Sequence, residues 1–166
     1  TDRAVTLEKA RAFIDCSELI GERFLGQYTA VTTSGTTGIR GIFVMDERSF
    51  KVTTALAVRM LRAWLNIGDV MRIVARSGHL SMIMATGGHF ASAVAAARLR
   101  ARSRWRAKSI QVLSVHMSVP ELVAELNRFQ PVVVAPYASV AALLATEQEA
   151  GRLSIAPILM TLAAEG

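Results

Sequence analysis

The chain is organised around the stretch Thr32-Thr33-Ser34-Gly35-Thr36-Thr37-Gly38-Ile39-Arg40-Gly41. Its ten residues include five hydroxyl side chains and three glycines, and none of them is a carboxylate. Glycine lets a ligand come close to the backbone, and hydroxyl groups donate hydrogen bonds to anionic oxygens. A loop with exposed backbone N–H groups is a common way of holding phosphate. The same composition is also typical of an ordinary surface loop, so the surrounding sequence has to distinguish the two.

The sequence on both sides of this stretch favours β-strands. Residues 28–33 and 41–45 are short segments rich in strand-forming side chains. We therefore predict a β-hairpin whose loop carries the hydroxyls and glycines. In a Walker loop or a Rossmann turn the glycines lead directly into a helix, and neither the Gly-Lys-Ser/Thr ending nor a Gly-x-Gly-x-x-Gly pattern occurs here. Both of these nucleotide-binding fingerprints are excluded.

Helices are predicted before and after the hairpin. Apolar residues at nearly helical spacing predict a helix over residues 7–24, with Thr6 as its N-cap. Asp46 is a suitable N-cap for a second helix that runs to about Leu65 and ends at Gly68. One face of this second helix carries apolar side chains, namely Phe50, Ala57, Leu61 and Trp64.

The remainder of the chain alternates between apolar strands and helices. We predict strands at 81–85, 109–115, 131–135 and 158–162, and helices at 90–104, 120–129 and 139–150. Buried strands separated by helices of ten to twelve residues indicate βαβ units. The predicted fold class is α/β: a mostly parallel sheet with helices on both faces, plus an N-terminal helix and the β-hairpin. Nothing marks an internal boundary, so we expect residues 1–166 to form one domain.

Composition excludes several classes of protein. The chain of 166 residues is 52% hydrophobic and 19% charged, which argues against disorder. Its single cysteine, Cys16, excludes an internal disulfide and fits a reducing compartment. The N-terminus lacks a secretory pattern, and the longest uncharged stretch, residues 80–97, contains a Gly-Gly-His turn. We expect a soluble, cytoplasmic protein with no membrane partner.

One local run supplies most of the net charge of +6. It consists of Arg98, Arg100, Arg102, Arg104, Arg106 and Lys108. Trp105 lies within this Arg98–Lys108 run and is suited to stacking on a base. Either the run is the solvated end of a helix and its loop, or it binds an acidic partner, the phosphates of CoA or a nucleic acid. Because the remaining charge is close to neutral, basicity is weak evidence for a nucleic-acid partner.

Other common sites have no support in the sequence. The three histidines and Cys16 show no metal-ligand spacing, so no metal site is predicted. No Gly-x-Ser-x-Gly elbow of a serine hydrolase occurs. The carboxylates are scattered, and those at 121, 125, 147 and 149 are predicted on the outer faces of helices.

The stretch Thr33-Ser34-Gly35-Thr36-Thr37-Gly38 resembles the phosphate loop of the adenylate-forming enzymes, the superfamily of acyl-CoA synthetases and related ligases. Three later segments look like the phenylacetate–CoA ligase and coenzyme F390 synthetase-like branch of that superfamily. They are Ala85-Thr86-Gly87-Gly88-His89-Phe90-Ala91-Ser92, Leu126-Asn127-Arg128-Phe129-Gln130-Pro131 with Tyr137-Ala138-Ser139, and Glu149-Ala150-Gly151-Arg152-Leu153-Ser154-Ile155. The resemblance covers the chain from about Gly26 onward.

The resemblance implies a reaction in which a carboxylic acid and ATP form an acyl-AMP and pyrophosphate, and the acyl group then passes to the thiol of CoA. It implies ATP and Mg²⁺ as cofactors and an aryl or other carboxylic acid as substrate. The residues implied to hold the ATP phosphates are Thr33, Ser34, Gly35, Thr36, Thr37, Gly38 and Arg40. His89 and Tyr137 each follow a predicted strand, where ligands bind in open α/β sheets, and are candidates for the acid pocket. Both could equally be structural residues.

Two departures from the family pattern bear on function. The family loop continues with a Pro-Lys pair where this chain has Arg40-Gly41, and arginine does not replace lysine neutrally at a phosphate. The family's Tyr-x-x-Thr-Glu motif, its ribose-binding Asp and its C-terminal lid with the catalytic lysine have no counterpart in this sequence. We therefore expect a piece of the large N-terminal domain that is inactive alone, with no catalytic residue of its own. The alternative function is a non-catalytic module whose Arg98–Lys108 run holds a polyanion or a protein, and we expect a homodimer.

Overall fold

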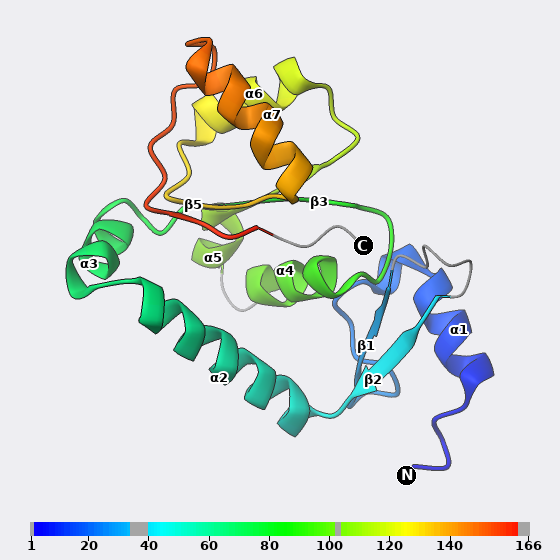
Figure 1. The fold of residues 1–166 in the computed structure, drawn as a ribbon. Helices are drawn as coiled ribbons and strands as arrows, with labels where there is room; N and C mark the ends of the chain where they lie inside the picture. The colour runs from blue at the N-terminus through cyan, green and yellow to red at the C-terminus, as the bar shows by residue number, and fades with distance from the viewer. Residues whose placement is uncertain (1, 34–39, 102–103, 163–166) are drawn as a thin grey trace. The chain divides into compact units, whose positions relative to one another are not determined.

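The computed structural model describes residues 2–33, 40–101 and 104–162, and the chain forms two compact units (Figure 1). Unit one comprises Thr1–Leu65 and Gly87–Arg98, and unit two comprises Asn66–Thr86 and Leu99–Gly166. The chain thus leaves unit one and later returns to it. The single domain expected over residues 1–166 stays a prediction.

Unit one is built on a two-stranded antiparallel hairpin. Its elements are α1 (Leu7–Asp15), a short 3₁₀-helix η1 (Ser17–Leu19), β1 (Thr29–Thr32), β2 (Ile42–Met45), α2 (Glu47–Trp64) and the first part of α4 (Ala91–Ala101). The predicted hairpin is confirmed, with Thr29 opposite Met45 and Thr32 opposite Ile42. A small core forms where α1 packs on the hairpin, and its buried members are Ala10, Ile14, Phe24 and Ala30.

The first helix begins where the sequence predicts and ends much earlier. The Thr6 hydroxyl accepts a hydrogen bond from the Lys9 N–H, as expected of an N-cap. The helix ends at Asp15, so the predicted continuation to residue 24 is wrong. The chain instead turns at Gly21, whose φ of +93° favours glycine, and a Cβ built there would lie only 2.8 Å from the Cβ of Ala97.

The α2 helix has its predicted start and its predicted end near Leu65, but Gly68 does not end it. Asp46 caps it by accepting a hydrogen bond from the Ser49 N–H at 2.6 Å. It ends at Trp64 because a new helix, α3 (Ile67–Ala75), starts with a capping box between Asn66 and Asp69. Gly68 lies inside α3, so its predicted role as the end of α2 is wrong.

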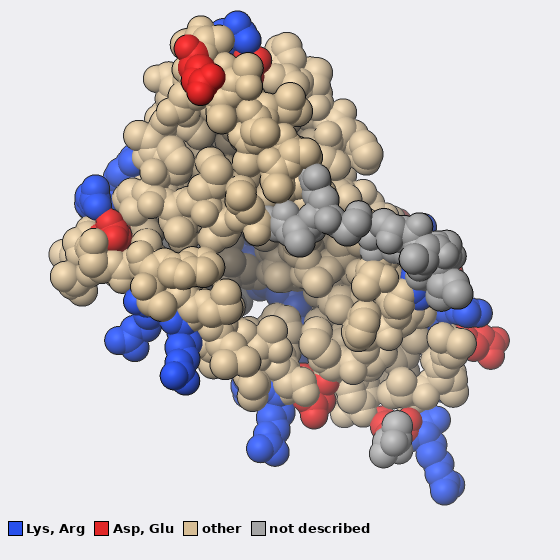
Figure 2. All heavy atoms as spheres, in the orientation of Figure 1, with Lys and Arg blue, Asp and Glu red and all other residues tan. Residues whose placement is uncertain are grey.

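No residue of α2 is fully buried. Phe50 is half-buried as predicted, but Trp64, predicted on the same apolar face, is 60% exposed. Leu56 and Met60 are also more than half exposed. Basic side chains of α2 are exposed too, and Figure 2 shows lysines and arginines projecting along this part of the surface. The homodimer expected from the sequence stays a prediction.

Unit two is a four-stranded parallel sheet with the strand order β4-β3-β5-β6. Its elements after α3 are β3 (Leu80–Met84), α5 (Arg104–Ser109), β4 (Ile110–Ser114), α6 (Val119–Phe129), β5 (Val133–Ala135), α7 (Ala138–Glu149) and β6 (Leu159–Met160). All three strand pairings are parallel, which confirms the predicted α/β class. Within the predicted helix over residues 90–104, α4 covers Ala91–Ala101, and α5 begins at Arg104.

The strand order places helices on opposite sides of this sheet. The chain steps from β3 to β4 in one direction and from β4 through β5 to β6 in the other. With right-handed crossovers, the first step must put its helix on the opposite face from the helices of the next two steps. Accordingly, α6 and α7 cover one face, and α5 lies on the other side of the sheet in Figure 1. The core under α6 and α7 includes Ile83, Leu113, Leu126, Val134 and Leu144.

The contrast between α6 and α2 gives a matched test of this packing. Leu126 is fully buried in α6, whereas Leu56 is 56% exposed in α2. We expect Leu126→Ala to lower the free energy of unfolding by about 2–5 kcal/mol, because it leaves a cavity. Leu56→Ala should change it by about 0.5 kcal/mol or less. Urea denaturation followed by circular dichroism measures both, and equal losses would contradict the packing described here.

The start of α6 makes stability depend on pH. The Ser118 hydroxyl, followed by the Ser118 N–H, donates to the Glu121 carboxylate and lowers its pKa. Because the folded pKa lies below the unfolded value, this carboxylate stabilises the fold above its ordinary pKa and ceases to do so as pH falls through the folded pKa. Glu121→Gln should therefore lose stability relative to the parent at pH 7, and the difference should shrink toward pH 3. A difference that is constant with pH in denaturation titrations would contradict this assignment.

Candidate functional site

The base of the predicted phosphate loop is held by two hydrogen bonds in unit one. The Thr33 N–H donates to the Gly41 carbonyl at 3.0 Å, and the Gly41 N–H donates to the Thr33 hydroxyl at 2.9 Å. Thr33 and Arg40 are both exposed. The other residues predicted to hold phosphate lie outside the described residues; they are Ser34, Gly35, Thr36, Thr37 and Gly38. The loop is thus closed at its foot, and two of the seven predicted ligand residues flank it.

A third segment pairs with the hairpin at this foot. The Thr32 N–H donates to the His89 carbonyl at 2.8 Å, and Thr32 and Phe90 form a parallel β-bridge. The segment 87–90 therefore lies beside β1, although 57 residues separate His89 from Thr32 in the sequence. The structure brings together two segments on which the family resemblance rests. The β1 strand is fully buried between β2 and the segment 87–90. Its position therefore fixes the point where the loop begins.

His89 itself is buried, with 1% of its surface exposed. Its Nε2 lies 2.9 Å from the Cys16 carbonyl oxygen, and because a carbonyl only accepts, Nε2 must carry the proton. Its Nδ1 is buried without a hydrogen-bond partner among the described residues. The ring packs against Phe13 with the centroids 5.1 Å apart. His89 therefore has the surroundings of a core residue, and its role in a substrate pocket stays a prediction.

Tyr137 lies at the carboxyl edge of the parallel sheet in unit two. Its hydroxyl accepts a hydrogen bond from the Ala85 N–H at 3.3 Å, which joins the ends of β5 and β3. Close by in the fold, the Thr86 hydroxyl donates to the Ser114 hydroxyl at 3.2 Å and joins the ends of β3 and β4. The connection that follows β3 runs to one edge of the sheet, and the connection that follows β5 runs to the other edge. The switch point therefore lies between β3 and β5, and ligands of open α/β sheets bind at such a point. Thr86 and Ser114 were not predicted as site residues, since only the pairing of distant strands brings them together.

The Arg98–Lys108 run is divided by the fold. Arg98 belongs to unit one, where its guanidinium donates to the Thr29 hydroxyl and lies 4.6 Å from the centre of the Phe50 ring. Burial, followed by repulsion from Arg23, lowers the pKa of Arg98. Arg100 and Lys108 belong to unit two and are exposed. Arg98 therefore has a structural role within unit one.

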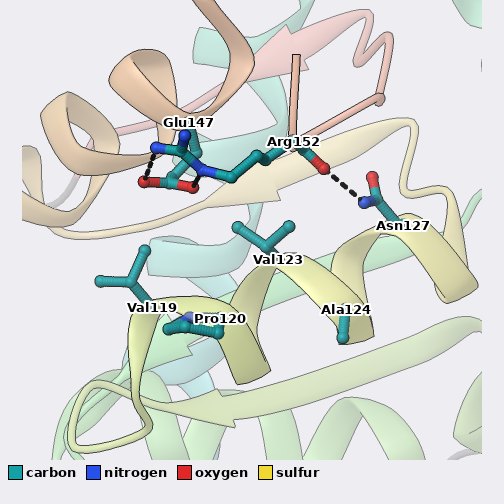
Figure 3. Close-up of a pocket in the computed structure, with 7 residues that line it drawn as sticks. All are labelled: Val119, Pro120, Val123, Ala124, Asn127, Glu147 and Arg152. Atoms are coloured by element: carbon teal, nitrogen blue, oxygen red, sulfur yellow. Dashed lines mark hydrogen bonds and ion pairs between the residues drawn. The ribbon is translucent and has the colours of Figure 1, made fainter. Parts of the chain in front are cut away.

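A groove between α6 and α7, with a volume of about 420 Å³, is shown in Figure 3. Val119, Pro120, Val123 and Ala124 form its apolar side. The polar rim is already paired: Arg152 donates two hydrogen bonds to Glu147, at 2.6 and 2.8 Å, and lowers the pKa of that carboxyl. Asn127 donates to the Arg152 carbonyl and accepts from the Ser154 N–H. These bonds fix the chain after α7, so we interpret the rim as structural.

No candidate metal site occurs in the part of the chain that the structure describes. There is no group of three histidine, cysteine, aspartate or glutamate side chains there that could hold a metal ion. In the same part of the chain, no helix is long and apolar enough to cross a membrane. Comparison with protein-family models, with curated proteins and with solved structures gives no match for this chain.

The surroundings of His89 lead to a test that separates a packing role from a ligand role. His89→Ala removes a buried ring and its bond to Cys16, and we expect it to lower the free energy of unfolding by about 2–4 kcal/mol. His116 is exposed, so His116→Ala is the matched control and should cost about 0.5 kcal/mol or less. Thermal and urea denaturation measure both variants. A His89→Ala variant as stable as the control would mean that the ring does not support the core.

Proposed function

We propose that this chain provides the ATP-phosphate-binding portion of an adenylate-forming acid–CoA ligase. In this proposal, the loop from Thr33 to Gly38 and the Arg40 guanidinium surround the β and γ phosphates of ATP. The observation that supports it best is the closed foot of the loop, where Thr33 and Gly41 exchange two hydrogen bonds beside a buried strand. A loop held at both ends can present its N–H groups and hydroxyls to an anion with little loss of conformational entropy on binding.

The residues at the foot of the loop suit an anion. No carboxylate occurs between Thr32 and Gly41, and Arg40 is exposed. The Thr33 hydroxyl accepts from the Gly41 N–H and keeps its own O–H to donate. When bound, Mg²⁺ would neutralise part of the charge of the phosphates. The chain's own part is to position the phosphates and to balance the charge that develops on them during the reaction.

This chain alone is proposed to carry out only one step of the full reaction. In the full reaction a substrate carboxylate attacks the α-phosphorus of ATP, and pyrophosphate leaves. The thiol of CoA then takes the acyl group of the resulting acyl-AMP, and AMP leaves. The acid itself, aryl or another carboxylic acid, is proposed to bind at the carboxyl edge of the parallel sheet near Tyr137. His89 is proposed to contribute to substrate binding by anchoring the segment 87–90 beside β1. Phosphate binding is the step assigned to this chain alone.

Isothermal titration calorimetry tests the proposal. The chain should bind Mg²⁺-ATP and pyrophosphate and should bind AMP much more weakly, because AMP lacks the β and γ phosphates. Arg40→Ala should weaken ATP binding about 5- to 10-fold, as expected for one charge-assisted contact. Arg59→Ala, an exposed arginine of α2 in the same unit, is the matched control and should bind ATP as the parent does.

Two results would contradict the proposal. One is AMP binding as tight as ATP binding, since the phosphates would then contribute nothing. The other is an equal loss of affinity in Arg40→Ala and Arg59→Ala, because a general effect of charge would explain it.

A further inference from the structure

A second anion site is suggested by a groove along the free edge of the sheet in unit two. The groove has a volume of about 360 Å³, and strand residues 110–113 of β4 line one side of it. Three cationic side chains line the rest, together with Glu125 and Phe129; they are Arg100, Lys108 and Arg128. We call this feature the β4 groove. It lies within unit two, whereas the loop proposed to hold ATP lies in unit one.

We propose that the β4 groove binds a phosphate-bearing anion through Arg100, Lys108 and Arg128. The three cations come from three elements, α4, α5 and α6, and converge on one groove. Among the described residues that line the groove, Glu125 is the one carboxylate, so the four charged groups of this lining sum to +2. This inference does not depend on the function proposed for the loop.

The groove has an ordered polar side. The Ser81 hydroxyl donates to Gln111 at 2.8 Å, the Gln111 amide donates to Glu125 at 2.9 Å, and Arg128 donates to the same Glu125 oxygen at 2.6 Å. This chain of bonds begins at a fully buried residue of β3 and ends at the guanidinium of Arg128. Arg128 is therefore held in place while its other N–H groups remain available to a ligand.

The edge strand adds a backbone donor. β4 is the outermost described strand on its side of the sheet, and the Val115 N–H donates to Met84 of β3. Because N–H groups alternate in direction along a strand, that of Val112 points away from β3, toward the outer edge. The edge of a sheet can form an anion-binding concavity through such N–H groups. The groove thus combines side-chain charge with a directed N–H group.

A purely protective role is the main competing explanation, since charged side chains at a sheet edge discourage pairing with other chains. Protection needs charges on the strand itself. Here the cations belong to helices before and after β4, and one of them, Arg128, is hydrogen-bonded to Glu125. Cations that converge from three helices on one groove suit the binding of an anion.

Nuclear magnetic resonance and fluorescence titrations test the site on the whole chain. Inorganic phosphate and pyrophosphate represent a small ligand, and fluorescein-labelled single-stranded DNA represents a polyanion. We expect the small anions to shift the amide signal of Val112. Whichever probe binds, Arg100→Ala and Lys108→Ala should each weaken it about 3- to 10-fold. Arg72→Ala, an exposed arginine of unit two that pairs with Asp69, is the matched control and should bind as the parent does.

The salt dependence separates the two sources of phosphate. If the ligand is a polyanion, the slope of log K against log salt is negative, and its magnitude should decrease by about one for each cation removed. Tight binding of pyrophosphate with no gain for DNA would identify a small anion. DNA binding that survives in the Arg100→Ala/Lys108→Ala double variant but is lost when Arg102, Arg104 and Arg106 are changed would overturn the proposal. No amide shift with any probe would also overturn it.

Discussion

The backbone of β3 imposes the constraint on which unit two depends. Its buried polar groups must find partners on both sides, and they do so in β4 on one side and β5 on the other. Ser81 and Ile83 of this strand are fully buried, so water cannot replace either neighbour. Once β3 is central, the connections must run outward in both directions, and right-handed crossovers then assign the helices to the two faces. The switch point beside Tyr137 follows from the same constraint.

Much of this architecture can be predicted from sequence because strong local patterns produce it. The alternation of apolar strands and helices after residue 80 predicts the parallel sheet, and Asp46 and Thr6 predict two helix starts through their capping side chains. The end of α1 and the role of Gly68 were predicted wrongly. Gly68 has the residue type of a helix end, but the capping box between Asn66 and Asp69 starts a new helix before it. A local competition between two signals decided that boundary, and residue type alone does not rank them.

Predicting the candidate sites from sequence is limited in the same way, because local signals do not show which distant residues come together. The hairpin around the hydroxyl-glycine loop was predicted because its signals all lie within residues 28–45. Arg128 was not associated with the Arg98–Lys108 run, because only the packing of α6 beside β4 brings the two together. Arg98 was grouped with that run by its neighbours in sequence, and the fold gives it to a different unit. Charge patterns along a chain thus identify candidates, and long-range contacts decide which of them act together.

The discontinuity of unit one has a consequence for the order of folding during synthesis. Its hairpin takes the segment 87–90 as a third partner, and Arg98 joins β1 and α2 from still later in the chain. Residues 1–65 alone therefore lack part of their own interior when they leave the ribosome. They must stay incomplete while β3 is made, and at 5–20 residues per second this wait lasts a few seconds. During that interval the side of β1 that later pairs with residues 87–90 is open to other partners.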